Sequence, residues 1–147
     1  MSKIIAFILL FPLSSFSQIS SESKNLAWCE GVYVYYAQYF QLKNNEGAAK
    51  NLLFRSSRVV AANMFLNLEN GKVSGDKIGQ FKETRKNMKS LLDSNPENHM
   101  TEITKCDSSV QSTIATVKSK GQIWDGQNFD MLQQSMMNKY LSMLGIK

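Results

Sequence analysis

Histidine is almost absent from this sequence, which has a single one, His99. A zinc site needs three or four side-chain ligands, and His99 with Glu102 offers two at best. Cys106 follows His99 by seven residues, about 10 Å along a helix, which is too far for a thiolate and an imidazole to touch. The scarcity of histidine therefore argues against a metal site and against a nucleophilic enzyme.

Motifs that hold cofactors are missing as well. The sequence has no Cys-x-x-Cys-His haem attachment motif and no glycine-rich phosphate loop. Four methionines crowd the C-terminal segment at spacings that do not place them on one helical face: Met131, Met136, Met137 and Met143. We interpret them as adaptable core fillers rather than Cu(I) ligands. We expect a protein that is not an enzyme and needs no cofactor.

Long apolar runs are absent beyond the N-terminus. There, Lys3 precedes a ten-residue apolar run over residues 4–13, followed by the small residues Ser15 and Ser17, which is the order of a secretory signal peptide. Such a run spans only about 15 Å as a helix, roughly half the hydrocarbon thickness of a membrane. We predict cleavage before Gln18. The mature domain, residues 18–147, is then periplasmic or secreted and has no stable membrane insertion.

The mature chain is only mildly basic. Of the 17 basic residues, cleavage removes Lys3, so the mature chain has 16 against 12 acidic ones, a net charge of about +4. Dedicated nucleic-acid binders are usually much more basic. We expect no nucleic-acid partner.

The two cysteines, Cys29 and Cys106, are predicted to form a disulfide. Disulfides persist in the compartments that exported proteins reach. In the chain-entropy model, closing a loop of this length stabilises the fold by about 4–5 kcal/mol, less any strain.

The apolar residues of the mature chain recur at helical spacing rather than in alternation. Although residues 27–40 are rich in valine and tyrosine, a helix over 26–43 places Glu30, Gln38 and Gln41 together, opposite its main apolar face. Further helices are predicted over 47–69, over 76–94, after Asn95 and after Asp125. The sequence therefore predicts an all-α fold, a single compact bundle of four to five helices with one disulfide.

Turn and cap residues predict where these helices begin and end. The stretch 69–75, with Asn70 and Gly71, is a stop signal for the second helix. Asn95 and Pro96 are a suitable cap and first-turn pair for the fourth helix. Asp125 is a suitable cap for the fifth.

The second predicted helix has polar and apolar residues in unexpected places. Its second apolar stripe, Phe54, Ala61, Phe65 and Leu68, indicates either a central position in the bundle or an exposed contact surface. Its main apolar face also contains Ser56, Asn63 and Asn67, which need hydrogen-bond partners if they are buried. We expect them to bond to the tyrosines of the first helix or to line a small polar pocket.

The third predicted helix has a basic flank. Lys82, Lys86 and Lys89 cluster beside its apolar face, and Arg85 falls within that face. Two interpretations are open: a solvated flank on which Arg85 lays its stem along the core, or a docking surface for an acidic partner with Arg85 as the anchor.

These observations lead to two functional hypotheses. The first is an exported, non-catalytic protein-binding module of the inhibitor, immunity-protein or periplasmic-adaptor type. Its partner is an unidentified protein, for which the basic flank favours an acidic surface, and it contacts that flank together with Phe54, Phe65 and Leu68. The second is a carrier of a small apolar or anionic ligand held between helices, with Tyr33, Tyr36, Asn63 and Asn67 at the site. A filled interior with an exposed apolar stripe favours the first, and a sizeable pocket with convergent polar groups favours the second.

Overall fold

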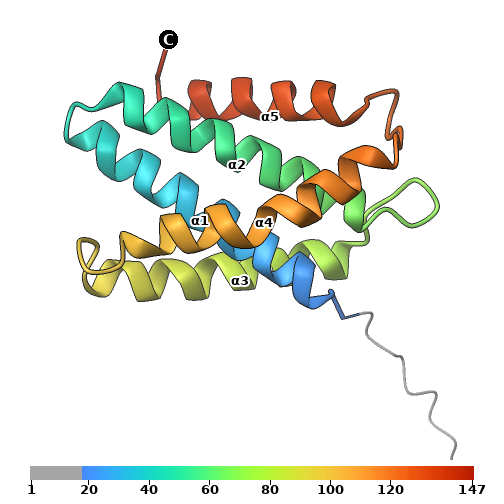
Figure 1. Cartoon of the computed structure of the whole chain (residues 1–147), viewed down its shortest axis with the longest axis horizontal. Helices are drawn as coiled ribbons and strands as arrows, with labels where there is room; N and C mark the ends of the chain where they lie inside the picture. Colours follow the sequence, from blue (N-terminus) through green and yellow to red (C-terminus); the bar gives the residue numbers. More distant parts are fainter. Residues whose placement is uncertain (1–17) are drawn as a thin grey trace, which may run out of the picture.

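The structure, a computed structural model, describes residues 18–147, so the predicted signal peptide lies outside the described part. Five helices make up the regular structure of these residues (Figure 1): α1 Ser21–Leu42, α2 Glu46–Leu66, α3 Gly75–Ser94, α4 Thr101–Ser119 and α5 Phe129–Met143. The predicted all-α bundle is confirmed.

α1 is the central helix of the bundle. It packs against α2, α3 and α4, while α5 packs on α2. In Figure 1, α2 and α5 lie along one edge of the bundle, α3 along the opposite edge, and α1 and α4 cross between them. Tyr33 and Tyr36 are among the largest fully buried side chains, which explains why a segment of strand-like composition is helical: burial on several sides overrides the weak β preference.

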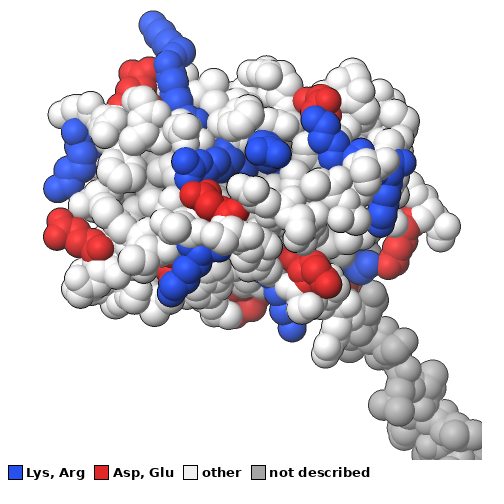
Figure 2. Space-filling model, in the orientation of Figure 1, with Lys and Arg blue, Asp and Glu red and all other residues white. Residues whose placement is uncertain are grey.

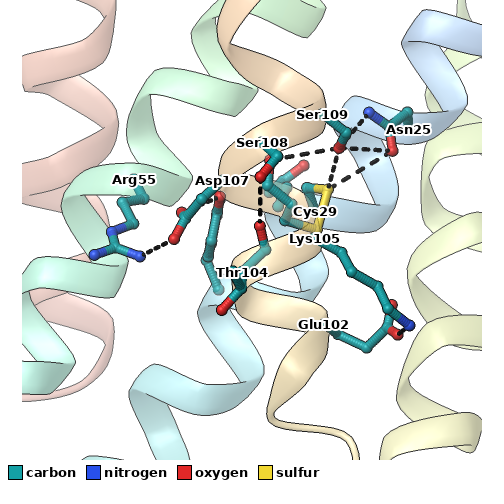
Figure 3. The surroundings of a disulfide bond; sticks show 12 residues. Asn25, Cys29, Arg55, Glu102, Thr104, Lys105, Asp107, Ser108 and Ser109 are labelled. Carbon is teal, nitrogen blue, oxygen red and sulfur yellow. Dashed lines mark hydrogen bonds and ion pairs between the residues drawn. A yellow bond between two sulfur atoms is a disulfide. The ribbon is translucent and has the colours of Figure 1, made fainter.

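The predicted disulfide is confirmed. Cys29 of α1 and Cys106 of α4 are bonded, with their Cα atoms 5.4 Å apart. Figure 3 shows that Asn25 and Ser109 lie beside the bond, where the Asn25 amide donates to the Ser109 hydroxyl at 3.0 Å. The bridge therefore joins the central helix to an outer helix that is distant in sequence.

α2 ends at Leu66, earlier than the predicted end near Asn70. The reason is a tight turn over residues 69–72, in which Asn70 and Gly71 both have positive φ, 51° and 75°. Asn-Gly is the preferred pair for this kind of turn. Asn70 and Gly71 therefore mark a hairpin-like turn that follows the helix, and the helix itself ends before them.

The prediction that Asp125 caps α5 is wrong. Asp125 and Gly126 form a second tight turn with positive φ, and Asn128 is the cap: its side chain accepts from the Met131 N–H at 2.9 Å. The Trp124 indole N–H bonds to the carbonyl of Gly71 at 3.1 Å, so the two turns dock on each other. This docking holds Asp125 in the turn and away from the helix end.

The prediction that Asn95 and Pro96 open the fourth helix is also wrong. α4 begins at Thr101, and its cap position, Met100, has no side-chain capping bond. Asn95 instead accepts from the N–H of Asn98 at 3.3 Å, within a turn that precedes the helix. The Tyr36 hydroxyl donates to the Pro96 carbonyl at 2.6 Å, which ties this turn to α1.

Replacing Asn128 by alanine is expected to lower the free energy of unfolding by about 1 kcal/mol, because the first turn of α5 loses its side-chain acceptor. Urea unfolding followed by circular dichroism measures the change. Asp125→Gly is the control, since glycine suits the positive φ there and the change should stay within about 0.5 kcal/mol of zero. A larger loss of stability for Asp125→Gly than for Asn128→Ala would mean that Asp125 is the cap.

Candidate functional site

A groove of about 500 Å³ lies over α1, between α3 and α5. The walls are largely apolar, and three of the apolar side chains are methionines. The apolar residues that contribute to the lining are Val34 of α1, Val60 of α2, Met88 of α3, and Met136 and Met143 of α5. Pockets of this size and lining are typical of sites for small molecules.

Glu30, in the middle of α1, forms the polar floor of the groove. It is only 6% exposed, although the helical pattern placed it with Gln38 on the side away from the main apolar face. Glu30 and Gln38 do share a face, since both line the groove, but Glu30 is buried there because side chains from α3 and α5 reach it and supply its hydrogen-bond partners. Arg85 Nη1 donates to Glu30 Oε2 at 2.8 Å, and the Tyr140 hydroxyl donates to Glu30 Oε1 at 2.8 Å.

The three polar side chains on the floor complement one another, with Arg85 and Tyr140 as donors and Glu30 as the acceptor. Burial, and then the adjacent Glu30 charge, raise the pKa of Tyr140, so its phenol stays protonated and remains a donor. Arg85 is about one-third exposed, with its side chain reaching from α3 into the groove. Glu30 therefore has a donor on each carboxylate oxygen, and a buried carboxylate needs such partners.

Gly31 lets α3 come close to α1 beside this floor. A Cβ added at Gly31 would lie 2.4 Å from Cε of Met88 and 3.3 Å from Cγ of Arg85. Any larger residue would push the Met88 side chain aside and crowd the stem of Arg85. The glycine thus helps set both the depth of the groove and the position of Arg85.

Two lysines stand at the rim of the groove, Lys89 on α3 and Lys139 on α5. Lys89 forms an ion pair with Asp93, one turn further along α3. The remaining members of the predicted basic flank, Lys82 and Lys86, are exposed on α3 and do not contribute to the lining. The structure thus divides the flank, with Arg85 and Lys89 in the groove and two lysines outside it.

The second apolar stripe of α2 is mostly interior. Phe65 is buried and packs against Phe129, with ring centroids 6.3 Å apart. Leu68 is half-buried against the core, and Ala61 is fully buried. Only Phe54, 48% exposed, presents a large part of its surface to solvent. Phe65 is therefore not accessible to a partner in this fold.

The four residues predicted to line a ligand site are not brought together. Asn63 and Asn67 form a buried network with Ser23: the serine hydroxyl donates to Asn63 Oδ1 at 2.6 Å, and Asn67 Nδ2 donates to the serine at 2.9 Å. The expectation that these asparagines bond to the tyrosines is wrong. They lie near the C-terminus of α2, which meets the N-terminal turn of antiparallel α1, whereas Tyr33 and Tyr36 lie further along.

Tyr33 and Tyr36 bond to α4 and to the turn before it. The Tyr33 hydroxyl donates to Asp107 Oδ1 at 2.8 Å, and Arg55 pairs with the other oxygen of Asp107 at 2.6 Å (Figure 3). A small cleft of about 250 Å³ lies there, with Arg58 at its edge. The ion pair joins α2 to α4, so we interpret this cluster as structural.

Stability is expected to fall as the pH rises from 10 to 12. Burial raises the pKa of Tyr36 to about 12, and burial with the Asp107 hydrogen bond raises the pKa of Tyr33. A pKa that is higher in the folded state contributes stability that is complete below pH 10 and is lost as the pH rises through the folded value. Urea unfolding across this range tests it, and Tyr36→Phe should make the loss smaller. An equal loss in that variant would contradict the assignment.

Charges on the face shown in Figure 2 are interspersed, with basic and acidic side chains close together. Within residues 18–147, no three His, Cys, Asp or Glu side chains gather as a metal-binding group. None of the helices in this part of the chain combines the length and the apolar character needed to cross a membrane.

Comparison with protein family models, with curated proteins and with solved structures found no match to this chain.

Sequence reasoning missed several residues of the groove, among them Gly31, Met136, Lys139 and Tyr140. One signal was present: Glu30 is an acidic residue within an otherwise apolar stretch of α1. A charge in such a position needs partners from other elements if it is buried. Its partners are 55 and 110 residues away in sequence, which no local pattern indicates.

Proposed function

We propose that this protein is an exported, non-catalytic carrier of a small apolar or anionic molecule, which it binds in the groove over α1. The observation that carries the proposal is the groove itself, with about 500 Å³ of space, apolar walls and three polar side chains that converge on its floor. Small-molecule sites typically combine these features.

The distribution of the apolar surface supports a ligand more than a large protein interface. The second stripe of α2 was expected either to be central in the bundle or to form a contact surface, and Phe65 and Ala61 within it are buried. The methionines of the groove are flexible and polarizable, so they can adapt to ligands of different shape. Export is supported by the signal-like N-terminus and by the disulfide between Cys29 and Cys106.

Binding of N-phenyl-1-naphthylamine, an uncharged apolar fluorophore, tests the proposal. We expect saturable fluorescence enhancement with the mature protein. Met143→Gln should weaken binding by about 3- to 10-fold, because it places a polar group on the groove wall and loses about 1 kcal/mol of apolar contact.

Met131→Gln is the matched control for this experiment. Met131 and Met143 are both on α5 and are 53% and 57% exposed, but only Met143 contributes to the groove. We expect the control to bind the fluorophore as the wild type does. No saturable binding, or equal weakening in both variants, would reject the groove as a carrier site.

A second candidate is a protein-binding module with an acidic partner. Lys82 and Lys86 favour it, since both are exposed on α3 and stand outside the ion pairs that engage Arg85 and Lys89. Exposed lysines at the rim of an interface mainly raise the association rate in a salt-dependent way.

The double variant Lys82→Glu with Lys86→Glu distinguishes this candidate. If a partner is captured from the native compartment, the reversal should slow its association and weaken the dependence on salt, while the fold stays intact. If the association rate is unchanged at every ionic strength, these lysines are a solvated flank and do not contribute to binding.

A further inference from the structure

We propose that Arg85 binds the carboxylate of the carried molecule, so that the natural ligand is an apolar carboxylic acid. This inference rests on the carrier function proposed for the groove. It adds a chemical class of ligand and a residue that recognises it.

Arg85 has N–H donors that its hydrogen bond to Glu30 does not use. A guanidinium group carries five N–H donors in a planar fork, and the carboxylate of Glu30 bonds to Nη1. The side chain remains about one-third exposed and contributes to the groove lining, so its other donors can reach a second acceptor there. A carboxylate matches the geometry of that fork better than a neutral oxygen does.

The position of Arg85 is fixed before a ligand arrives. Glu30 on α1 holds the guanidinium, and Tyr140 on α5 holds the other oxygen of Glu30 at 2.8 Å. Three helices thus contribute to one network, and little conformational freedom is left for Arg85 to lose on binding. Polar groups held in this way by further hydrogen bonds are typical of binding sites.

The charge balance of the groove favours an anion. Its ionised side chains are Glu30, Arg85, Lys89 and Lys139, three cations against one carboxylate. Asp93 lies behind Lys89 as its ion-pair partner and reduces this excess in part. Glu30 is buried, and Arg85 and Tyr140 bond to its two oxygens, so a cationic ligand would meet the positive charge of Arg85 and the two lysines rather than an exposed carboxylate.

The walls of the groove suit an alkyl or similarly apolar body. Along α1 the lining extends from Glu30 to Gln38, about 12 Å at 1.5 Å per residue, with Val34 between them. Met136 and Met143 flank the same length from α5. An acid with its carboxylate at Arg85 can therefore lay its chain along the groove toward Gln38.

Three probes with the same twelve-carbon chain test the inference: dodecanoate, 1-dodecanol and dodecyltrimethylammonium. Each is titrated, below its micellar concentration, against the mature protein loaded with N-phenyl-1-naphthylamine, at pH 8 and low salt. We expect dodecanoate to displace the fluorophore at a concentration at least tenfold below that of dodecanol, and the cation to be the weakest. The advantage of the carboxylate should shrink as salt is added.

Two variants assign the effect to the proposed residues. Arg85→Lys keeps a positive charge but loses the planar fork, and it should reduce the carboxylate advantage to about threefold or less. Because that change could disturb the fold, Lys139→Gln at the exposed rim provides a second measurement, with an expected two- to fivefold reduction. Lys120→Gln, an exposed lysine beyond the end of α4, is the matched control and should change nothing.

The outcomes separate the inference from the function on which it rests. Failure of the fluorophore to bind rejects the carrier function and the inference with it. Fluorophore binding with equal displacement by dodecanoate and dodecanol leaves the carrier function and overturns the role of Arg85. Fluorophore binding that none of the three probes displaces also overturns the inference, and it points to a larger occupant such as a segment of a protein partner.

Discussion

Replacing Cys106 by serine is expected to lower the free energy of unfolding by about 4 kcal/mol, a large share of a typical total of about 5–15 kcal/mol. The disulfide closes a loop that extends from the first turns of α1 to α4, with a sequence separation of 77. Without it the unfolded chain gains conformational freedom. α4 also loses its covalent attachment to the central helix, so its packing on α1 must hold it alone.

Urea unfolding and thermal melting of the mature protein measure this effect. Wild-type protein treated with a reductant should behave like Cys106→Ser, since both lack the covalent link. Ser109→Ala, beside the disulfide, is the control and should change the stability by less than about 1 kcal/mol. If Cys106→Ser melts at the wild-type temperature, the bridge does not stabilise the fold.

Replacing Arg85 by alanine is expected to lower the free energy of unfolding by about 2–3 kcal/mol. The change leaves Glu30 buried with one donor, the Tyr140 hydroxyl, in place of two. Removing one partner of a buried ion pair costs about 3–5 kcal/mol, and the value is lower here because Arg85 is one-third exposed and its site is partly solvated.

A compensating change identifies the cause of that loss. In Glu30→Gln with Arg85→Ala no charge is left on the floor of the groove while the arginine stem is still missing, so the double variant should recover most of the stability that Arg85→Ala loses. Lys86→Ala, one residue further on the exposed side of α3, should have almost no effect. Equal losses for Arg85→Ala and the double variant would mean that packing of the arginine stem, rather than the stranded carboxylate, is responsible.

The helices and the disulfide could be predicted from the sequence because their causes are local or few. Apolar residues at helical spacing define a face to bury wherever the helix lies in the fold, so residues 27–40 were assigned correctly despite their valines and tyrosines. With two cysteines there is a single pairing to consider, and Cys29 and Cys106 form it.

The helix boundaries could be predicted only in part, because the same residue types serve in caps and in turns. Asp125 and Asn128 are both good capping residues, and the choice between them depends on the docking of Trp124 on Gly71. Asn95 was a reasonable cap by composition, but Tyr36 ties the following turn to α1 and the helix starts later. Contacts distant in sequence decided both cases.

Periodicity and cysteine count are enough to predict the all-α class, the bridge between two helices and the placement of tyrosines in the core. The roles of Arg85 and Glu30 depend on contacts that exist only in the folded molecule. The sequence could place Arg85 within an apolar face and Glu30 on the polar side of its own helix. It could not show that α3 approaches α1 at Gly31 or that Tyr140 of α5 reaches Glu30. These contacts bury Glu30, set Arg85 on it and leave the groove between α3 and α5, because hydrogen bonds and close packing depend on distances in space rather than on positions along the chain.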